Sequence, residues 1–266
     1  RAKLGEKLRA DGYYEYDTIG NAGINGIQLR PGTWDYYDST RGVETALRVF
    51  APAFGKSHLI GHSYGGLAVA ISLGNLENST TEGNTDRKAS QILRKIHSVV
   101  FAAPLLAAPI VKGRVEIWWG EQLAANQRST TNITLQELHE WMFANGIYVY
   151  RAGSDMKAES SDKVETLVKL SFRLQDGMYP FPARVKRVLF INPADDEYIR
   201  ASGMNDFIGK IPAAVQVTGL VYSEALGNEK PPEGKGIEAH DMWNTYAAEY
   251  DEFFKGRRPK VIREGQ

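Results

Sequence analysis

Residues 57–73 restrict the possible folds of this chain more than any other segment. Ser57-His58-Leu59-Ile60 is a short run suited to a buried strand, and Leu67–Leu73 has the composition of a helix. Between them lies Gly61-His62-Ser63-Tyr64-Gly65-Gly66, a glycine-rich stretch with one serine at its centre. The segment therefore predicts a strand that passes through a tight turn directly into a helix.

The same alternation of strand and helix patterns recurs along the chain. Helical spacing of apolar residues is found at 2–10, 38–50 and 246–254. Further strands are expected at 13–19, 99–103, 188–191 and 215–222, whereas the polar stretch 77–88 has the composition of a loop. This order predicts the α/β class, with a mainly parallel central sheet covered by helices on both faces.

Residues 105–183 interrupt the alternation and favour an inserted helical cap. We expect residues 1–104 and 184–266 to form the core domain around it. The insert is rich in large side chains, and Trp118, Trp119, Trp141 and Met142 are candidates for lining a substrate pocket. The alternative is that these four residues form the apolar interior of the cap itself.

Composition excludes several classes of protein. Lys plus Arg and Asp plus Glu number 32 each, so no overall field favours nucleic acid or an anionic membrane. The chain has no cysteine, which excludes disulfides, thiolate catalysis and cysteine-bound metal. Its longest apolar run, 99–111, contains two prolines and falls short of the ~20 residues that a membrane helix needs. Compartment and oligomeric state stay open.

Ser63 is the candidate nucleophile of the chain. A sharp strand-to-helix turn lifts a serine hydroxyl above the sheet, and the following helix directs N–H groups at it. We expect the turn to require glycine at Gly61 and Gly65, because a side chain at either position would collide with neighbouring backbone in so tight a turn. The alternative is a turn serine without function.

A serine nucleophile needs a histidine as base, and the chain contains five histidines. His58, His62, His97 and His139 are predicted to be structural or exposed, from their positions in a strand, in the turn, before a strand and on a cap helix. His240 follows the last predicted strand and precedes the final helix, where a loop at the carboxyl edge of a parallel sheet can reach the turn.

The third group, an orienting carboxylate, is expected after the strand 188–191. Asp195, Asp196 and Glu197 all follow it, and a solvated acidic turn is the alternative for each of them. The order Ser63, acid, His240 is one of the known orders of a catalytic triad. No metal is expected, because His58 and His62 stand four apart on an extended segment without a suitably spaced acid.

Taken together, these motifs resemble the α/β-hydrolase superfamily. Gly61-His-Ser-Tyr-Gly-Gly66 is similar to its nucleophile elbow, and Ala239-His240 to its histidine loop. Asp17-Thr-Ile-Gly20-Asn-Ala22 resembles an Asp-x-x-Gly-x-Gly loop, with Ala22 in place of the second glycine. Pro193–Ile199 resembles the acid turn and favours Asp196. The family also has an earlier strand with an oxyanion loop, which we expect to have been omitted from this chain; the alternative is that this member builds its oxyanion hole differently.

The resemblance implies a serine hydrolase that cleaves a carboxylic ester of a small molecule through an acyl-enzyme, without a cofactor. Ser63 would attack, His240 would act as base and then acid, Asp196 would orient His240, and the backbone N–H of Tyr64 would stabilise the oxyanion. The same triad serves amide or peptide cleavage, C–C hydrolysis and acyl transfer. A ligand-binding protein that keeps the fold without catalysis is the alternative from another class.

Overall fold

The structure is a computed structural model that describes residues 2–13, 36–81, 86–104, 106, 170, 173–174, 176–193, 207–222 and 247–257. Its helices are α1 (Ala2–Ala10), α2 (Tyr36–Phe50), α3 (Tyr64–Thr81), α4 (Arg87–Lys95) and α10 (Ala247–Phe254), with a short 3₁₀ helix, η2 (Ala51–Ala53). Its strands are β1 (Ser57–His62), β2 (Ile96–Ala102), β3 (Arg187–Pro193) and β4 (Gln216–Tyr222).

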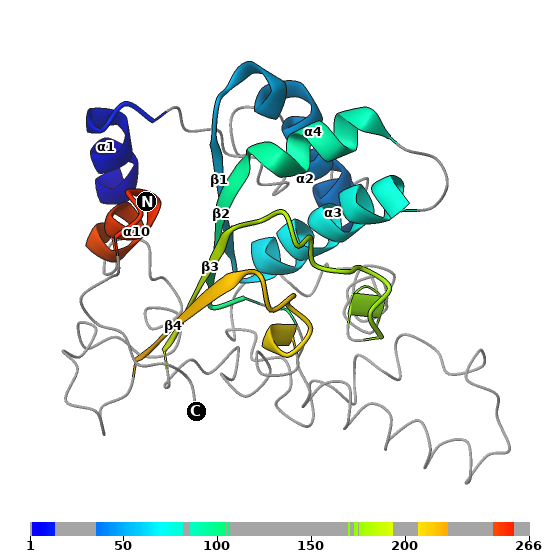
Figure 1. Cartoon of the computed structure of the whole chain (residues 1–266). Helices are drawn as coiled ribbons and strands as arrows, with labels where there is room; N and C mark the ends of the chain where they lie inside the picture. Colours follow the sequence, from blue (N-terminus) through cyan, green and yellow to red (C-terminus); the bar gives the residue numbers. More distant parts are fainter. Residues whose placement is uncertain are drawn as a thin grey trace, which may run out of the picture.

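The four strands form one sheet in the order β1-β2-β3-β4, and every neighbouring pair is parallel. Helices α2, α3 and α4 cover one face of the sheet, and α1 and α10 cover the other (Figure 1). The predicted α/β class, with a parallel sheet between two helical layers, is confirmed. The predicted strand 13–19 lies outside the described residues from position 14 onward.

Alternate residues of the central strands supply two separate cores. Val99 and Phe101 of β2 belong to the cluster beneath α2, α3 and α4, whereas Val100 and Ala102 belong to the cluster with α1 and α10. All four side chains are fully buried. Because successive side chains of a strand point to opposite faces, a continuous apolar run is what a strand buried on both faces requires.

The prediction of a loop at 77–88 is wrong at both ends of the range, and its middle, 82–85, lies outside the described residues. Helix α3 continues to Thr81, and a further helix, α4, begins at Arg87. The carboxylate of Asp86 accepts hydrogen bonds from the N–H groups of Lys88 and Ala89, at 3.0 and 3.1 Å, which caps the helix. The apolar residues Ile92 and Leu93 are buried against the core, although polar residues dominate the surrounding sequence.

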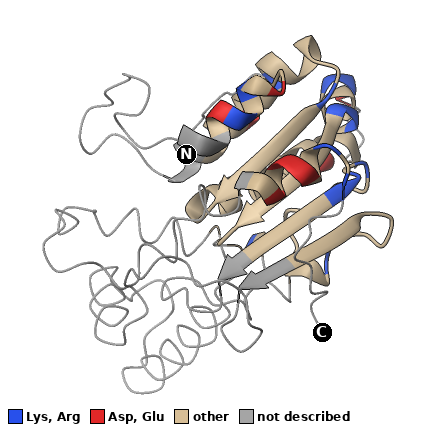
Figure 2. Cartoon of the chain, turned by 90° about the vertical axis from the view of Figure 1, so that its left-hand side faces the viewer, with Lys and Arg blue, Asp and Glu red and all other residues tan. Residues whose placement is uncertain are grey.

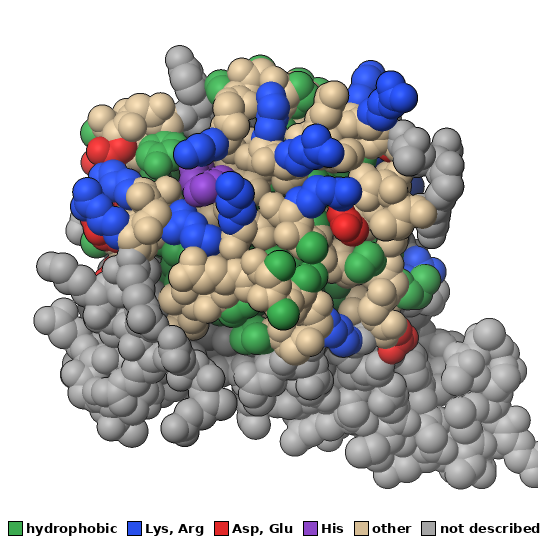
Figure 3. Space-filling view, in the orientation of Figure 1, with side chains coloured by type: hydrophobic (Ala, Val, Ile, Leu, Met, Phe, Trp, Pro, Cys, Tyr) green, Lys and Arg blue, Asp and Glu red, His purple; other side chains and the backbone are tan. Residues whose placement is uncertain are grey.

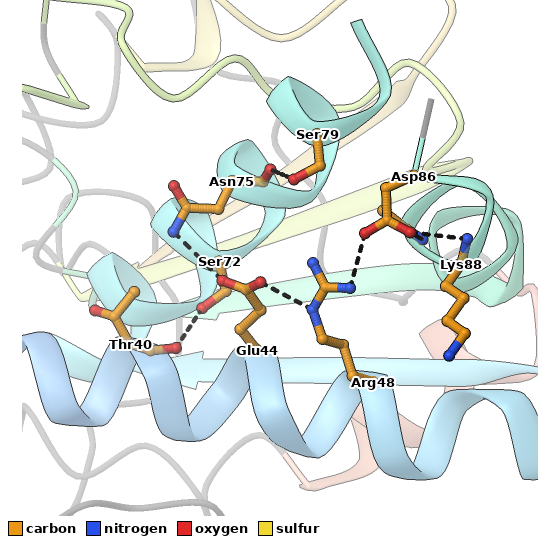
Figure 4. Close-up of polar contacts among 9 residues, drawn as sticks. Thr40, Glu44, Arg48, Ser72, Asn75, Ser79, Asp86 and Lys88 are labelled. Atoms are coloured by element: carbon orange, nitrogen blue, oxygen red, sulfur yellow. Dashed lines mark hydrogen bonds and ion pairs between the residues drawn. The ribbon is translucent and has the colours of Figure 1, made fainter. Parts of the chain in front are cut away.

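Polar contacts hold the three helices of this layer together (Figure 4). The Arg48 guanidinium of α2 donates to Glu44 at 3.0 Å within its own helix and to Asp86 at 2.9 Å at the start of α4. Glu44 also accepts a hydrogen bond from Asn75 of α3 at 3.5 Å. The pKa of Asp86 is lowered, first by its hydrogen bond with Arg48 and then by its bonds to the helix N–H groups.

Some of the described residues between 170 and 183 pack on the core. Leu170, Leu174 and Phe181 are buried in the same cluster as α3 and β2. Leu106, near the start of 105–183, belongs to the same buried cluster, and the rest of 105–183 lies outside the described residues. The boundaries of the cap therefore stay a prediction.

Candidate active site

Ser63 occupies the turn between β1 and α3. It is the one residue between the end of the strand at His62 and the start of the helix at Tyr64. Its φ is 53°, a left-handed backbone conformation that costs a residue with a side chain ~1–2 kcal/mol. The carboxyl edge of the sheet thus carries a strained, partly exposed serine, as the sequence predicts.

Two glycines make this turn possible, but they are Gly61 and Gly66. A Cβ atom on Gly61 would lie 2.7 Å from the Cα of Gly66 and 2.8 Å from the carbonyl oxygen of Gly65. A Cβ atom on Gly66 would lie 2.5 Å from the Cβ of Pro104. The expectation for Gly65 is wrong, because a Cβ atom there would meet nothing within 4 Å. The helix turns this position away from the strand.

Hydrogen bonds attach the turn to the neighbouring strands. The N–H of Ser63 donates to the carbonyl of Ala102 at 3.0 Å, and the N–H of Ala103 donates to the carbonyl of Ile191 at 2.7 Å. The ends of β1, β2 and β3 are thereby tied together along one edge. The position of Ser63 is set by two strands distant in the sequence as well as by its own turn.

Ala103 also has a positive φ, 41°, directly beside the turn. Sequence reasoning missed this second strained residue, since an alanine carries no signal for a left-handed conformation. Its neighbour Pro104, which ends the apolar strand, packs against Gly66. The only sequence signal for this support is the proline immediately after the strand.

The amino end of α3 faces the serine. Tyr64 is its first residue, and the N–H of Gly66 donates to the carbonyl of Ser63 at 2.9 Å. The first turn of α3 contains no acidic residue, so no carboxylate of the helix offsets the positive end of its dipole. This arrangement favours negative charge that develops beside Ser63.

The other predicted site residues lie outside the described residues. These are Asp196, His240, Trp118, Trp119, Trp141 and Met142. The strands that precede the first two in the sequence, β3 and β4, run parallel to β1 and end at the same edge as Ser63. The roles assigned to these residues stay predictions.

His58 and His97 lie at the opposite edge of the sheet, where β1 and β2 begin. His58 is five residues from Ser63 along a strand, which corresponds to about 16 Å. Its Nδ1 is 2.7 Å from the hydroxyl oxygen of the buried Ser98, and its ring packs on Phe254 with centroids 4.8 Å apart. Burial, followed by the nearby positive charges, lowers its pKa to about 4. The prediction that these two histidines are not bases for Ser63 agrees with this placement.

The described residues offer neither a metal site nor a membrane-spanning helix. They contain no group of three or more His, Asp or Glu side chains that could hold a metal ion. In the same part of the chain, no helix combines the length and the apolar character needed to span a membrane.

Comparison of whole structures finds known proteins that are similar to this chain. The alpha/beta hydrolase domain-containing protein 10 from mouse superposes with a TM-score of 0.54 at 13% identity, over 96% of this chain and 83% of that protein. The monoacylglycerol lipase of Paleococcus ferrophilus has a TM-score of 0.46 at 16% identity, over 93% and 88% of the two chains. An esterase from Exiguobacterium antarcticum has a TM-score of 0.45 at 12% identity, over 96% and 85%.

No family model matches the chain, and no curated protein matches it. The parallel sheet, the strained serine between β1 and α3 and the superposition on the mouse protein all agree with the resemblance found in the sequence. The chain has the fold of the α/β-hydrolase superfamily.

Proposed function

We propose that this protein is a serine hydrolase that cleaves a carboxylic ester through an acyl-enzyme. The observation that carries the proposal is the left-handed conformation of Ser63 at the junction of β1 and α3. A strained residue persists only where the surrounding structure holds it in place. Here Gly61, Gly66 and the bond to Ala102 all hold the serine there.

In the proposed mechanism, the hydroxyl oxygen of Ser63 attacks the ester carbonyl carbon while His240 takes the hydroxyl proton. The tetrahedral oxyanion accepts a hydrogen bond from the backbone N–H of Tyr64, at the positive end of α3. When the C–O bond to the alcohol breaks, His240 returns the proton to the leaving oxygen. Water then attacks the acyl-enzyme with the same help from His240, which releases the acid and restores Ser63.

Asp196 is proposed to orient the imidazole of His240 and to stabilise its charged form. This role rests on the position of Asp196 just after β3, which ends at the edge that carries Ser63. The substrate is proposed to be a small ester or acyl compound, with Trp118, Trp119, Trp141 and Met142 as apolar pocket residues.

A fluorophosphonate probe and short p-nitrophenyl esters test the proposal directly. We expect the wild-type protein to be labelled, and Ser63→Ala to lose labelling and about 10⁴–10⁶ in turnover. Ser90→Ala, which removes a half-buried serine of α4, is the matched control and keeps both activities. If wild type is not labelled, or Ser63→Ala labels equally well, the hydrolase proposal is wrong.

The acid is tested separately. Asp196→Asn is expected to lower turnover far more than Asp195→Asn. A larger loss in Asp195→Asn would assign the role to Asp195 instead.

A further inference from the structure

Basic side chains gather where the strands of the sheet begin, at the edge opposite Ser63. Lys56 precedes β1, His97 is the second residue of β2, and Lys186 and Arg187 stand at the start of β3. Ser98 pairs with both His58 and Arg187 in the parallel ladder, which brings the three strand starts side by side. Figure 2 shows Lys and Arg concentrated at this end of the sheet.

A β-bulge places His97 in this cluster. Ser57 pairs with Ile96 and His58 pairs with Ser98, so His97 is an extra residue without a partner in β1. A bulge redirects the side chain of the extra residue. The His97 ring accordingly lies edge-on to the His58 ring, with centroids 5.6 Å apart, and it stays partly exposed. Figure 3 shows a histidine surrounded by Lys and Arg side chains on this face.

The positive charges of the cluster are not neutralised by carboxylates of the described residues. Lys56 and Lys186 are exposed, and neither forms an ion pair within the described part of the chain. Arg187 donates one hydrogen bond to the carbonyl of Phe253 at 2.7 Å and lies over the ring of Phe253 at 4.8 Å. That bond uses one of the five N–H donors of the Arg187 guanidinium.

The pKa shifts of His97 and His58 also indicate an excess of positive charge around these rings. Burial lowers the pKa of His97, and Arg187, Lys56 and Lys186 lower it further. Arg187 and Lys56 also lower the pKa of His58, and no carboxylate of the described residues is among the causes of either shift. Asp11 and Asp251, which raise the pKa of Tyr13, pair with Lys255.

We propose that Lys56, His97, Lys186 and Arg187 form a binding site for a phosphate group, either inorganic phosphate or a phosphomonoester. A phosphate carries close to two negative charges and at least three acceptor oxygens, which suits donors that converge from three strand starts. A carboxylate has two oxygens and one charge, and would leave part of the cluster unneutralised. The site is separate from Ser63, so it does not depend on the proposed hydrolase activity.

The test is a titration of the full chain with inorganic phosphate at pH 7, with sodium chloride keeping the ionic strength constant. Imidazole NMR signals report on the site, and His97→Gln assigns the His97 signal among the five histidines. We expect a saturable shift of that signal and a raised pKa of His97, because a bound anion favours the protonated ring.

Two variants and one control locate the site. Lys56→Gln and Lys186→Gln should each weaken phosphate binding by about fivefold, the upper end for one exposed ion pair. Lys88→Gln, at the amino end of α4 and thus at the end away from the start of β2, should leave phosphate binding unchanged. All three lysines are exposed, so thermal melting should show that each variant folds.

Phenyl phosphate distinguishes the two sources of the group. Tighter binding of phenyl phosphate assigns the site to a phosphomonoester, and tighter binding of inorganic phosphate assigns it to the free anion. The proposal is overturned if neither binds, if sodium chloride alone gives the same shift, or if the Lys56 and Lys186 variants bind as wild type does.

Discussion

A methyl group added at Gly61 should destabilise the protein strongly, whereas the same change at Gly65 should not. In Gly61→Ala the new Cβ would stand 2.7 Å from the Cα of Gly66, 2.8 Å from the carbonyl oxygen of Gly65 and 2.9 Å from the nitrogen of Gly66. All three atoms are backbone, so the clash cannot be relieved by rotating a side chain. The turn that carries Ser63 would have to shift.

The cost of such overpacking is about 1–3 kcal/mol, and this site should lie at the upper end because strand and helix are both held by the core. For a protein of this size, 1 kcal/mol lowers Tm by about 2–4 °C, so Gly61→Ala should lower it by about 5–10 °C. Gly65→Ala places its methyl group in open space within a helix, where alanine is preferred over glycine. Its Tm should stay within about 2 °C of wild type.

Circular dichroism melting of the two variants measures this difference, and fluorophosphonate labelling measures the state of the turn. Gly61→Ala should label Ser63 more slowly at a temperature where the variant is still folded, because the displaced turn misplaces the hydroxyl. Equal melting temperatures for the two variants would refute the assignment of close packing to Gly61.

Three further substitutions test the core and the edge of the sheet where the strands begin. Phe101→Ala removes a fully buried ring that stacks on Phe190 at 5.2 Å, and should cost about 3–5 kcal/mol in urea denaturation; a cost under ~1 kcal/mol would contradict its place in the core. Ser72→Ala removes a buried hydroxyl whose oxygen is 2.7 Å from the Ala68 carbonyl oxygen and 3.0 Å from that of Thr40, and should cost about 1 kcal/mol, with the half-buried Ser90→Ala as the control. His58 has a pKa lowered from 6.5 to about 4, so the folded state binds fewer protons than the unfolded state between those values. The free energy of unfolding should therefore fall by up to about 3 kcal/mol as the pH drops from 6.5 to 4, and His58→Gln should reduce that slope; an unchanged slope would show that another group causes it.

The sequence alone predicted the strand, turn and helix around Ser63 and the parallel α/β class. Both rest on short-range patterns: the periodicity of apolar residues and the glycines around one serine. It also favoured structural or exposed roles for His58 and His97, from their positions within one strand and before another. It failed at α4, where a polar composition hides the few buried residues, Ala89, Ile92 and Leu93, that attach the helix to the core.

Only the tertiary structure decided which glycines the turn requires. Gly66 must lack a side chain because Pro104, 38 positions later in the chain, packs against it, and no local pattern contains that contact. The left-handed Ala103 and the bond from Ser63 to Ala102 likewise depend on the pairing of β1 with β2. The basic cluster at the other edge arises in the same way, because Lys56, His97 and Arg187 are far apart in the sequence and become neighbours only when their strands align. Short-range patterns determine each element, but contacts between distant residues determine which side chains share an edge of the sheet.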